Sequence, residues 1–94
     1  MSREKIVVPM ATLEFEKYEE NGLTYYEFNA TECQPPEPMV NAMHALKLLK
    51  SESDRVVGIF FHEPVPLYGK ISQVFTHSAT ELEGGDFRIE FKLK

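Results

Sequence analysis

Residues 13–28 read LEFEKYEENGLTYYEF, and this stretch decides how the fold begins. Apolar and polar residues alternate over 13–18, and a second strand-like run follows over 23–28. Asn21-Gly22 lies between the two runs and accepts the positive φ angles of a type I′ turn. The stretch therefore predicts a β-hairpin.

The segment that follows the hairpin predicts a helix over residues 37–50. Three prolines stand at its start, where a missing N–H costs nothing, and Glu37 complements the positive helix end. The apolar positions recur with the helical period of 3.6 residues. The predicted apolar face holds Met39, Ala42, Met43, Leu46 and Leu49, and the predicted outward face holds Asn41, His44 and Lys47.

The second half of the chain predicts three more strands and one more helix. Residues 55–61 are apolar without alternation, which is typical of a strand covered on both sides. A second helix is predicted over residues 66–77, with a short strand at Leu82 behind it. Residues 87–93 alternate cleanly and predict the last strand. The inward residues of that second helix are expected to be Leu67, Tyr68, Ile71, Val74 and Phe75.

This order of elements predicts an α+β fold with one domain. A two-layer sandwich results when a mixed sheet is covered on one face by both amphipathic helices. The strand–helix–strand unit from Tyr25 to Phe61 is expected to be a right-handed parallel crossover. A chain of 94 residues has room for one modest core.

Composition and charge exclude several classes of protein. The single cysteine rules out an internal disulfide, and with three histidines at irregular spacing no metal site is predicted. The formal charge is −5, and no basic patch suits a nucleic acid, whereas a basic partner protein is compatible. Apolar runs are too short for a membrane span or a signal peptide, so a cytoplasmic protein is expected. The acids concentrate between residues 11 and 40, against Lys17 alone: Glu14, Glu16, Glu19, Glu20, Glu27, Glu32 and Glu37.

Two proline-containing motifs carry a resemblance to a known superfamily. Residues 32–40, ECQPPEPMV, resemble the start of the first helix in the TusA-like (SirA-like) sulfur-carrier proteins, which have a Cys-Pro-x-Pro motif there. Residues 62–68, HEPVPLY, are similar to a branch of that superfamily catalogued as domain of unknown function 2249. The likeness implies a four-stranded β-α-β-α-β-β domain over residues 23–94. Residues 1–22 would then be an extension that adds one strand.

The first motif departs from the sulfur-carrier pattern at the position of the thiol. Pro35 stands where a carrier has its cysteine, and Cys33 lies two residues earlier. The resemblance still implies an accessory role in a redox or sulfur pathway. A helix N-terminus favours the Cys33 thiolate, whereas Glu32 and Glu37 oppose it, so Cys33 is either a reactive thiol or an inert turn residue.

A candidate ligand site follows from the expected topology. His62 ends the strand over 55–61 and is either a functional group or a strand cap that bonds the backbone. Both helix N-termini are expected at the carboxyl edge of the sheet, where ligands collect in α/β proteins. The residues predicted to share this pocket are Gln34, Glu37, His62, Glu63 and Tyr68.

Three functions remain open on the sequence. The first is a non-enzymatic module that binds a small molecule or a partner protein through this pocket. The second is a sulfur-relay protein that uses Cys33. The third is a homodimer, because the predicted outer strand over 13–18 has a free edge.

Overall fold

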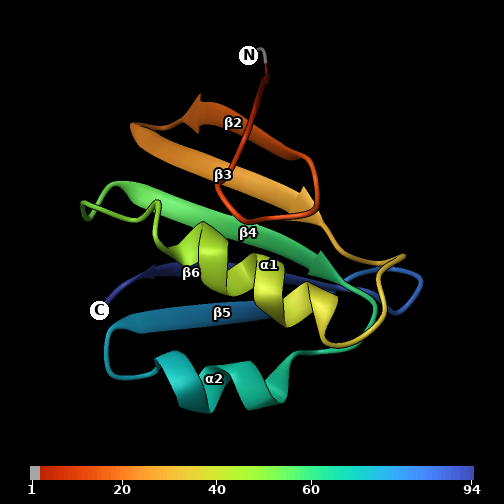
Figure 1. Cartoon of the computed structure of the whole chain (residues 1–94). Coiled ribbons are helices and arrows are strands. Elements are labelled where there is room, and N and C mark those ends of the chain that lie inside the picture. The colour runs from red at the N-terminus through yellow and green to blue at the C-terminus, as the bar shows by residue number, and fades with distance from the viewer. Residues whose placement is uncertain (1–2) are drawn as a thin grey trace.

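The computed structural model describes residues 3–94 and contains six strands and two helices (Figure 1). Their order along the chain is β1 (Glu4–Ile6), β2 (Phe15–Glu20), β3 (Leu23–Asn29), α1 (Glu37–Leu46), β4 (Asp54–Phe60), α2 (Val65–Ile71), β5 (Phe75–Glu81) and β6 (Phe87–Leu93). Within the described residues, no helix has the length and apolar character needed to cross a membrane.

All six strands form one mixed sheet in the order β1-β2-β3-β4-β6-β5. Only β3 and β4 run parallel, and the chain connects them through α1, as expected for the crossover. The hairpin between β2 and β3 is confirmed, with Asn21 at φ 54° and Gly22 at φ 81°. The carboxyl ends of β3 and β4 therefore meet at the same edge of the sheet, from which both helices start.

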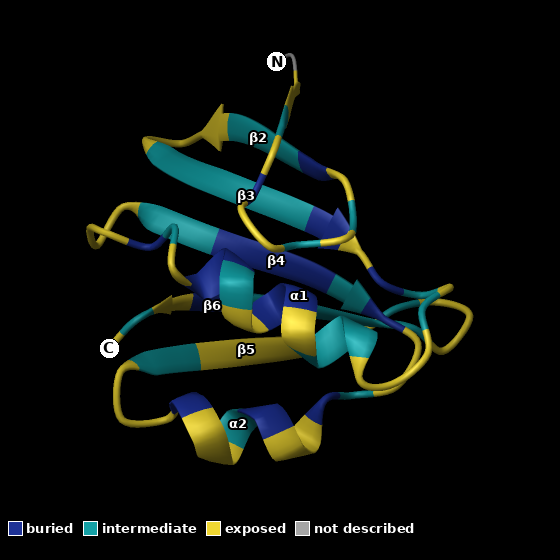
Figure 2. Cartoon of the chain, in the orientation of Figure 1, coloured by how far each residue is buried: buried dark blue, intermediate teal, exposed yellow. Residues whose placement is uncertain are grey.

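Both helices contribute to one apolar cluster with the sheet. Ala42 and Ala45 of α1 belong to it together with Leu67 and Ile71 of α2. Figure 1 shows α1 over the middle of the sheet and α2 beside β5, and Figure 2 shows that the middle of β4 is buried. The predicted α+β architecture, with two helices packed on a mixed sheet, is confirmed.

A glycine in β4 makes room for the aromatic part of the core. The rings of Phe28 and Phe60 meet edge to face with centroids 5.6 Å apart. A Cβ atom on Gly58 would lie 2.6 Å from the Phe60 ring and 2.7 Å from the Phe28 ring. Gly58 thus lets both rings lie directly against the strand, next to the edge where the pocket forms.

The sheet has one strand more than predicted. β1 pairs with β2, and Ile6 lies opposite Phe15. A strand of three residues is too short to show an alternation of apolar and polar residues in the sequence. It is recognised as a strand only by its pairing with β2. The outer edge of residues 15–17 is therefore paired, contrary to the expectation that this strand has a free edge. The homodimer hypothesis stays a prediction.

The predicted helix over residues 66–77 is wrong in its second half. α2 ends at Ile71, and the chain turns and returns as β5 along β6. Val74 and Phe75 continue the helical spacing of Leu67 and Ile71, which explains the error. Val74 is 55% exposed in the turn, and Leu82, predicted as a strand, lies in the connection to β6.

Helix α1 also differs from the prediction in length and in orientation. It ends at Leu46 rather than at Lys50. Asn41, predicted to point outward, is fully buried, and Met43, predicted to point inward, is 45% exposed. The reason is a second contact: α1 packs against the loop before β2 as well as against the sheet. The Asn41 carboxamide accepts hydrogen bonds from the backbone N–H groups of Thr12 and Leu13, at 2.8 and 3.1 Å.

Candidate functional site

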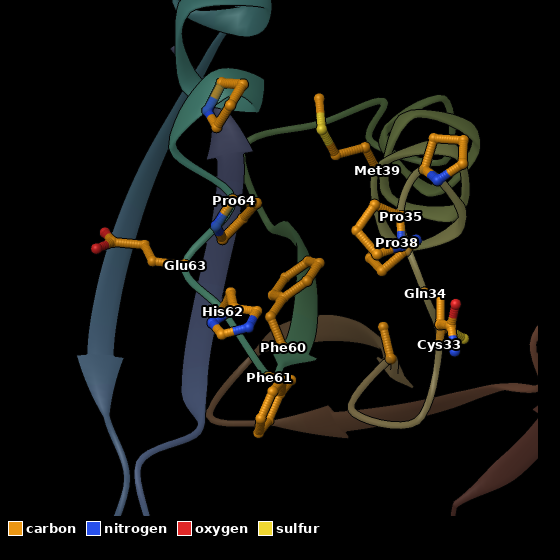
Figure 3. A pocket seen from close by; sticks show the side chains of 13 residues that line it. Cys33, Gln34, Pro35, Pro38, Met39, Phe60, Phe61, His62, Glu63 and Pro64 are labelled. Carbon is orange, nitrogen blue, oxygen red and sulfur yellow. The ribbon is translucent and has the colours of Figure 1, made fainter.

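A pocket of about 480 Å³ opens at the carboxyl edge of β3 and β4. Its two sides are the segment that leads into α1 and the segment that joins β4 to α2 (Figure 3). The volume lies within the range of small-molecule sites. The residues that line it are Ala30, Cys33, Gln34, Pro35, Pro36, Pro38, Met39, Phe60, Phe61, His62, Glu63, Pro64 and Pro66.

Proline is the most frequent residue type in the pocket wall. Five of the six prolines in the chain line it, and each helix has a proline in its first turn. Proline has a fixed φ and no N–H group, so these segments are stiff and present few backbone donors to the cavity. The wall is therefore apolar as a consequence of how both helices begin.

Aromatic and sulfur-containing side chains complete the apolar lining. Phe60 is the last residue of β4 and is buried, whereas Phe61, one position later, is 58% exposed at the rim. Met39 of α1 and Ala30, the residue after β3, line the pocket from the other side. Large exposed apolar side chains beside a pocket are typical of a binding site rather than of solvent-facing surface.

His62 lies at the rim and is exposed to solvent. Its ring packs edge-on against the Phe61 ring, with centroids 4.4 Å apart. Figure 3 shows His62 and Cys33 on opposite sides of the pocket. The two residues therefore do not form the adjacent thiol and imidazole that an activated nucleophile requires.

Glu63 and Tyr68 hold the start of α2 in place. The Tyr68 hydroxyl donates to the Glu63 carboxylate at 3.0 Å, and the Tyr68 ring stacks on His77 of β5 with centroids 3.5 Å apart. Burial and this carboxylate raise the pKa of Tyr68 well above its ordinary value. Figure 3 shows the Glu63 side chain directed away from the pocket. Tyr68 does not line the cavity, and it contacts the pocket wall through its hydrogen bond to Glu63.

Cys33 is a free, half-buried cysteine in the pocket wall. Burial raises its pKa, and the negative charges of Glu37 and Glu32 raise it further. The Glu37 carboxylate also accepts a hydrogen bond from the Thr12 hydroxyl and does not line the pocket. Although Cys33 stands before a helix N-terminus, the local charge opposes thiolate formation.

Of the residues predicted to share a site, Gln34, His62 and Glu63 line one pocket, together with Cys33. Glu37 and Tyr68 do not line it: Glu37 accepts a hydrogen bond from Thr12, and Tyr68 donates one to the lining residue Glu63. The prolines, Met39, Phe60 and Phe61 line the pocket as well, and so does Ala30, although none of them was predicted as a site residue. Two features of the sequence could have indicated them. Prolines cluster before both helices, and the aromatic pair Phe60-Phe61 stands at the end of the buried strand β4.

Comparison of the chain with family models, with curated proteins and with solved structures gave no match. Within residues 3–94, no group of three or more histidine, cysteine, aspartate and glutamate side chains is placed to hold a metal ion. The fold and the site thus define a small α+β protein with an apolar pocket at the carboxyl edge of its sheet. The resemblance to the TusA-like superfamily stays a prediction.

Proposed function

We propose that this protein is a non-enzymatic binding module whose pocket takes the apolar part of a small ligand. The observation that carries the proposal is the pocket itself: about 480 Å³, walled by prolines and phenylalanines and open at the sheet edge. Burial of apolar surface supplies the affinity of such a site, and stiff walls reduce the entropy lost on binding.

The polar groups around the pocket favour binding over catalysis. The pKa of the Cys33 thiol is raised, and His62 stands across the cavity from it. The Glu63 carboxylate is engaged by Tyr68. A general acid–base pair or an activated nucleophile needs two such groups in mutual reach, so the sulfur-relay hypothesis has no geometric support. An accessory role in a redox or sulfur pathway rests on the sequence resemblance alone.

The test is an NMR titration with 4-phenylbutanol, a neutral probe with one apolar ring. We expect amide shifts to concentrate on residues that line the pocket, such as Ala30, Met39 and Phe61. In the variant Phe61→Ser the affinity should fall about fivefold or more, because apolar contact area at the rim is lost.

A matched control separates the pocket from general surface effects. Val74 is 55% exposed, close to the 58% of Phe61, but lies in the turn before β5 and outside the pocket. Val74→Ser should bind the probe like the wild type. The proposal fails if the probe shifts no pocket amide, or if both variants lose affinity equally.

A further inference from the structure

We infer that the ligand of this pocket is an organic cation: an apolar body that fills the cavity and a positive charge held at the rim. The inference rests on the proposed function, because it names the class of ligand for that same site. It follows from the charges that surround the apolar wall and from the aromatic rings within it.

The formal charges next to the pocket are negative. Glu63 is a lining residue, Glu37 opens α1, and Glu32 precedes the lining residue Cys33 in the chain. None of the thirteen lining residues is a lysine or an arginine. A ligand carboxylate or phosphate would meet neither a lysine nor an arginine in this lining, where His62 alone can take up a positive charge, whereas an ammonium group would be attracted by the carboxylates.

Two of these carboxylates are held in place beside the cavity by hydrogen bonds. Thr12 holds the Glu37 carboxylate and Tyr68 holds the Glu63 carboxylate, so both are fixed as charges beside the cavity. The pKa of the Cys33 thiol in the wall is raised by burial first, then by the charge of Glu37 and a hydrogen bond to it, and by the charge of Glu32. Burial disfavours a charge of either sign, whereas the negative charges of Glu37 and Glu32 disfavour an anion at the wall and favour a cation.

The N-terminus of α1 does not reverse the preference of the pocket for a cation over an anion. The start of α1 is flanked by Pro36 and Pro38, which have no N–H group to donate to an anion. Glu37 in the first turn already compensates the positive end of the helix dipole. In addition, Phe60 and Phe61 line the cavity, and an aromatic face within about 6 Å attracts a cation.

The experiment compares three probes that share one apolar body: 4-phenylbutylamine, 4-phenylbutanol and 4-phenylbutyrate. At about pH 8 the amine is protonated and the carboxylate is ionised. We expect the amine to bind the wild-type protein at least about tenfold more tightly than the carboxylate, with the alcohol between them. The ratio should decrease as salt is added, since the charges at the rim are near solvent.

Two single-charge variants test the origin of the preference. Glu32→Gln removes a carboxylate next to the pocket and should reduce the amine-to-carboxylate ratio about threefold. Glu52→Gln removes the same charge at the opposite end of β4, just before Asp54, and should leave the ratio unchanged.

The outcomes separate this inference from the proposed function. If the three probes bind with equal affinity at the pocket residues, the charge preference is wrong and the apolar binding site stands. If the carboxylate binds most tightly, the charge preference is also wrong. If none of the probes shifts a pocket amide, both the inference and the proposed function fail.

Discussion

Cys33 shows how neighbouring charges determine the chemistry of a single side chain. Its position before α1 is one that often activates a thiol. Here burial and the carboxylates of Glu37 and Glu32 act in the opposite direction and raise its pKa. Cys33 packs against the hydrophobic core as part of the pocket wall, and these surroundings disfavour its thiolate.

The alkylation rate of Cys33 as a function of pH tests this assignment. We expect the midpoint with iodoacetamide to lie above the ordinary value of about 8.5 for a free cysteine. Glu37→Gln removes one of the carboxylates that raise it and should lower the midpoint, while keeping an acceptor for Thr12. A midpoint near 7 in the wild type would instead revive the sulfur-relay hypothesis.

Helix α1 is held from two sides, which explains why its faces differ from a simple amphipathic pattern. Its apolar residues pack on the sheet, and Asn41 joins it to the loop before β2. The Asn41 side chain also donates to the Thr12 hydroxyl at 3.0 Å and to the backbone oxygen of Glu37 at 2.9 Å. All hydrogen-bonding positions of this buried amide are used, and one side chain satisfies two loop N–H groups.

Replacement of Asn41 by alanine should destabilise the protein by about 2–3 kcal/mol. The variant leaves the N–H groups of Thr12 and Leu13 without their acceptor in a partly buried site, and such groups cost about 1–3 kcal/mol when unpaired. Urea denaturation measures the change. Met43→Ala, at a half-exposed position of the same helix, should change stability by less than about 1 kcal/mol. Equal effects of the two variants would contradict this role of Asn41.

On the scale of the whole molecule, the face of the sheet away from the helices is covered by its own polar side chains. Tyr18 and Tyr25 stack with centroids 5.0 Å apart, and Arg3 lies 4.2 Å from the centre of the Tyr18 ring. The Tyr18 hydroxyl donates to Glu27 at 2.8 Å, and Arg3 pairs with the same carboxylate at 3.1 Å. This network ties β2 and β3 to the residue before β1.

The network predicts a loss of stability in alkaline solution. Burial and the Glu27 carboxylate raise the pKa of Tyr18 to about 12 in the folded state. An ordinary tyrosine, as in the unfolded chain, ionises near 10. The folded state therefore holds the phenolic proton more tightly, and this contribution is complete below about pH 10 and is lost as pH rises towards about 12.

Urea denaturation between about pH 9 and about pH 12 measures this loss. In Tyr18→Phe the decline should be shallower than in the wild type. Part of it should remain, because the pKa of Tyr68 is raised as well. Parallel declines in the two proteins would show that Tyr18 does not contribute.

The local signals in the sequence determined the hairpin, the element order from β2 to α2, the last strand and the α+β class. An Asn-Gly turn, a proline-led helix start and a period-two strand each act over a few neighbouring residues, so they are readable without a structure. The juxtaposition of Gln34, His62 and Glu63 was also predictable, because the carboxyl ends of two parallel strands meet at one edge.

Only the tertiary structure decided the rest. β1 and β5 form strands because they pair with β2 and β6. Their own residues do not favour a strand over another conformation. Asn41 is buried because its side-chain oxygen accepts a hydrogen bond from the backbone N–H of Thr12, which lies in a loop 29 residues earlier. Glu37 and Tyr68 do not line the pocket: Glu37 is held by Thr12, and Tyr68 is held by Glu63 and stacks on His77. The free energy of such contacts depends on partners that folding brings together, and for most of these contacts the partner lies far away in the sequence.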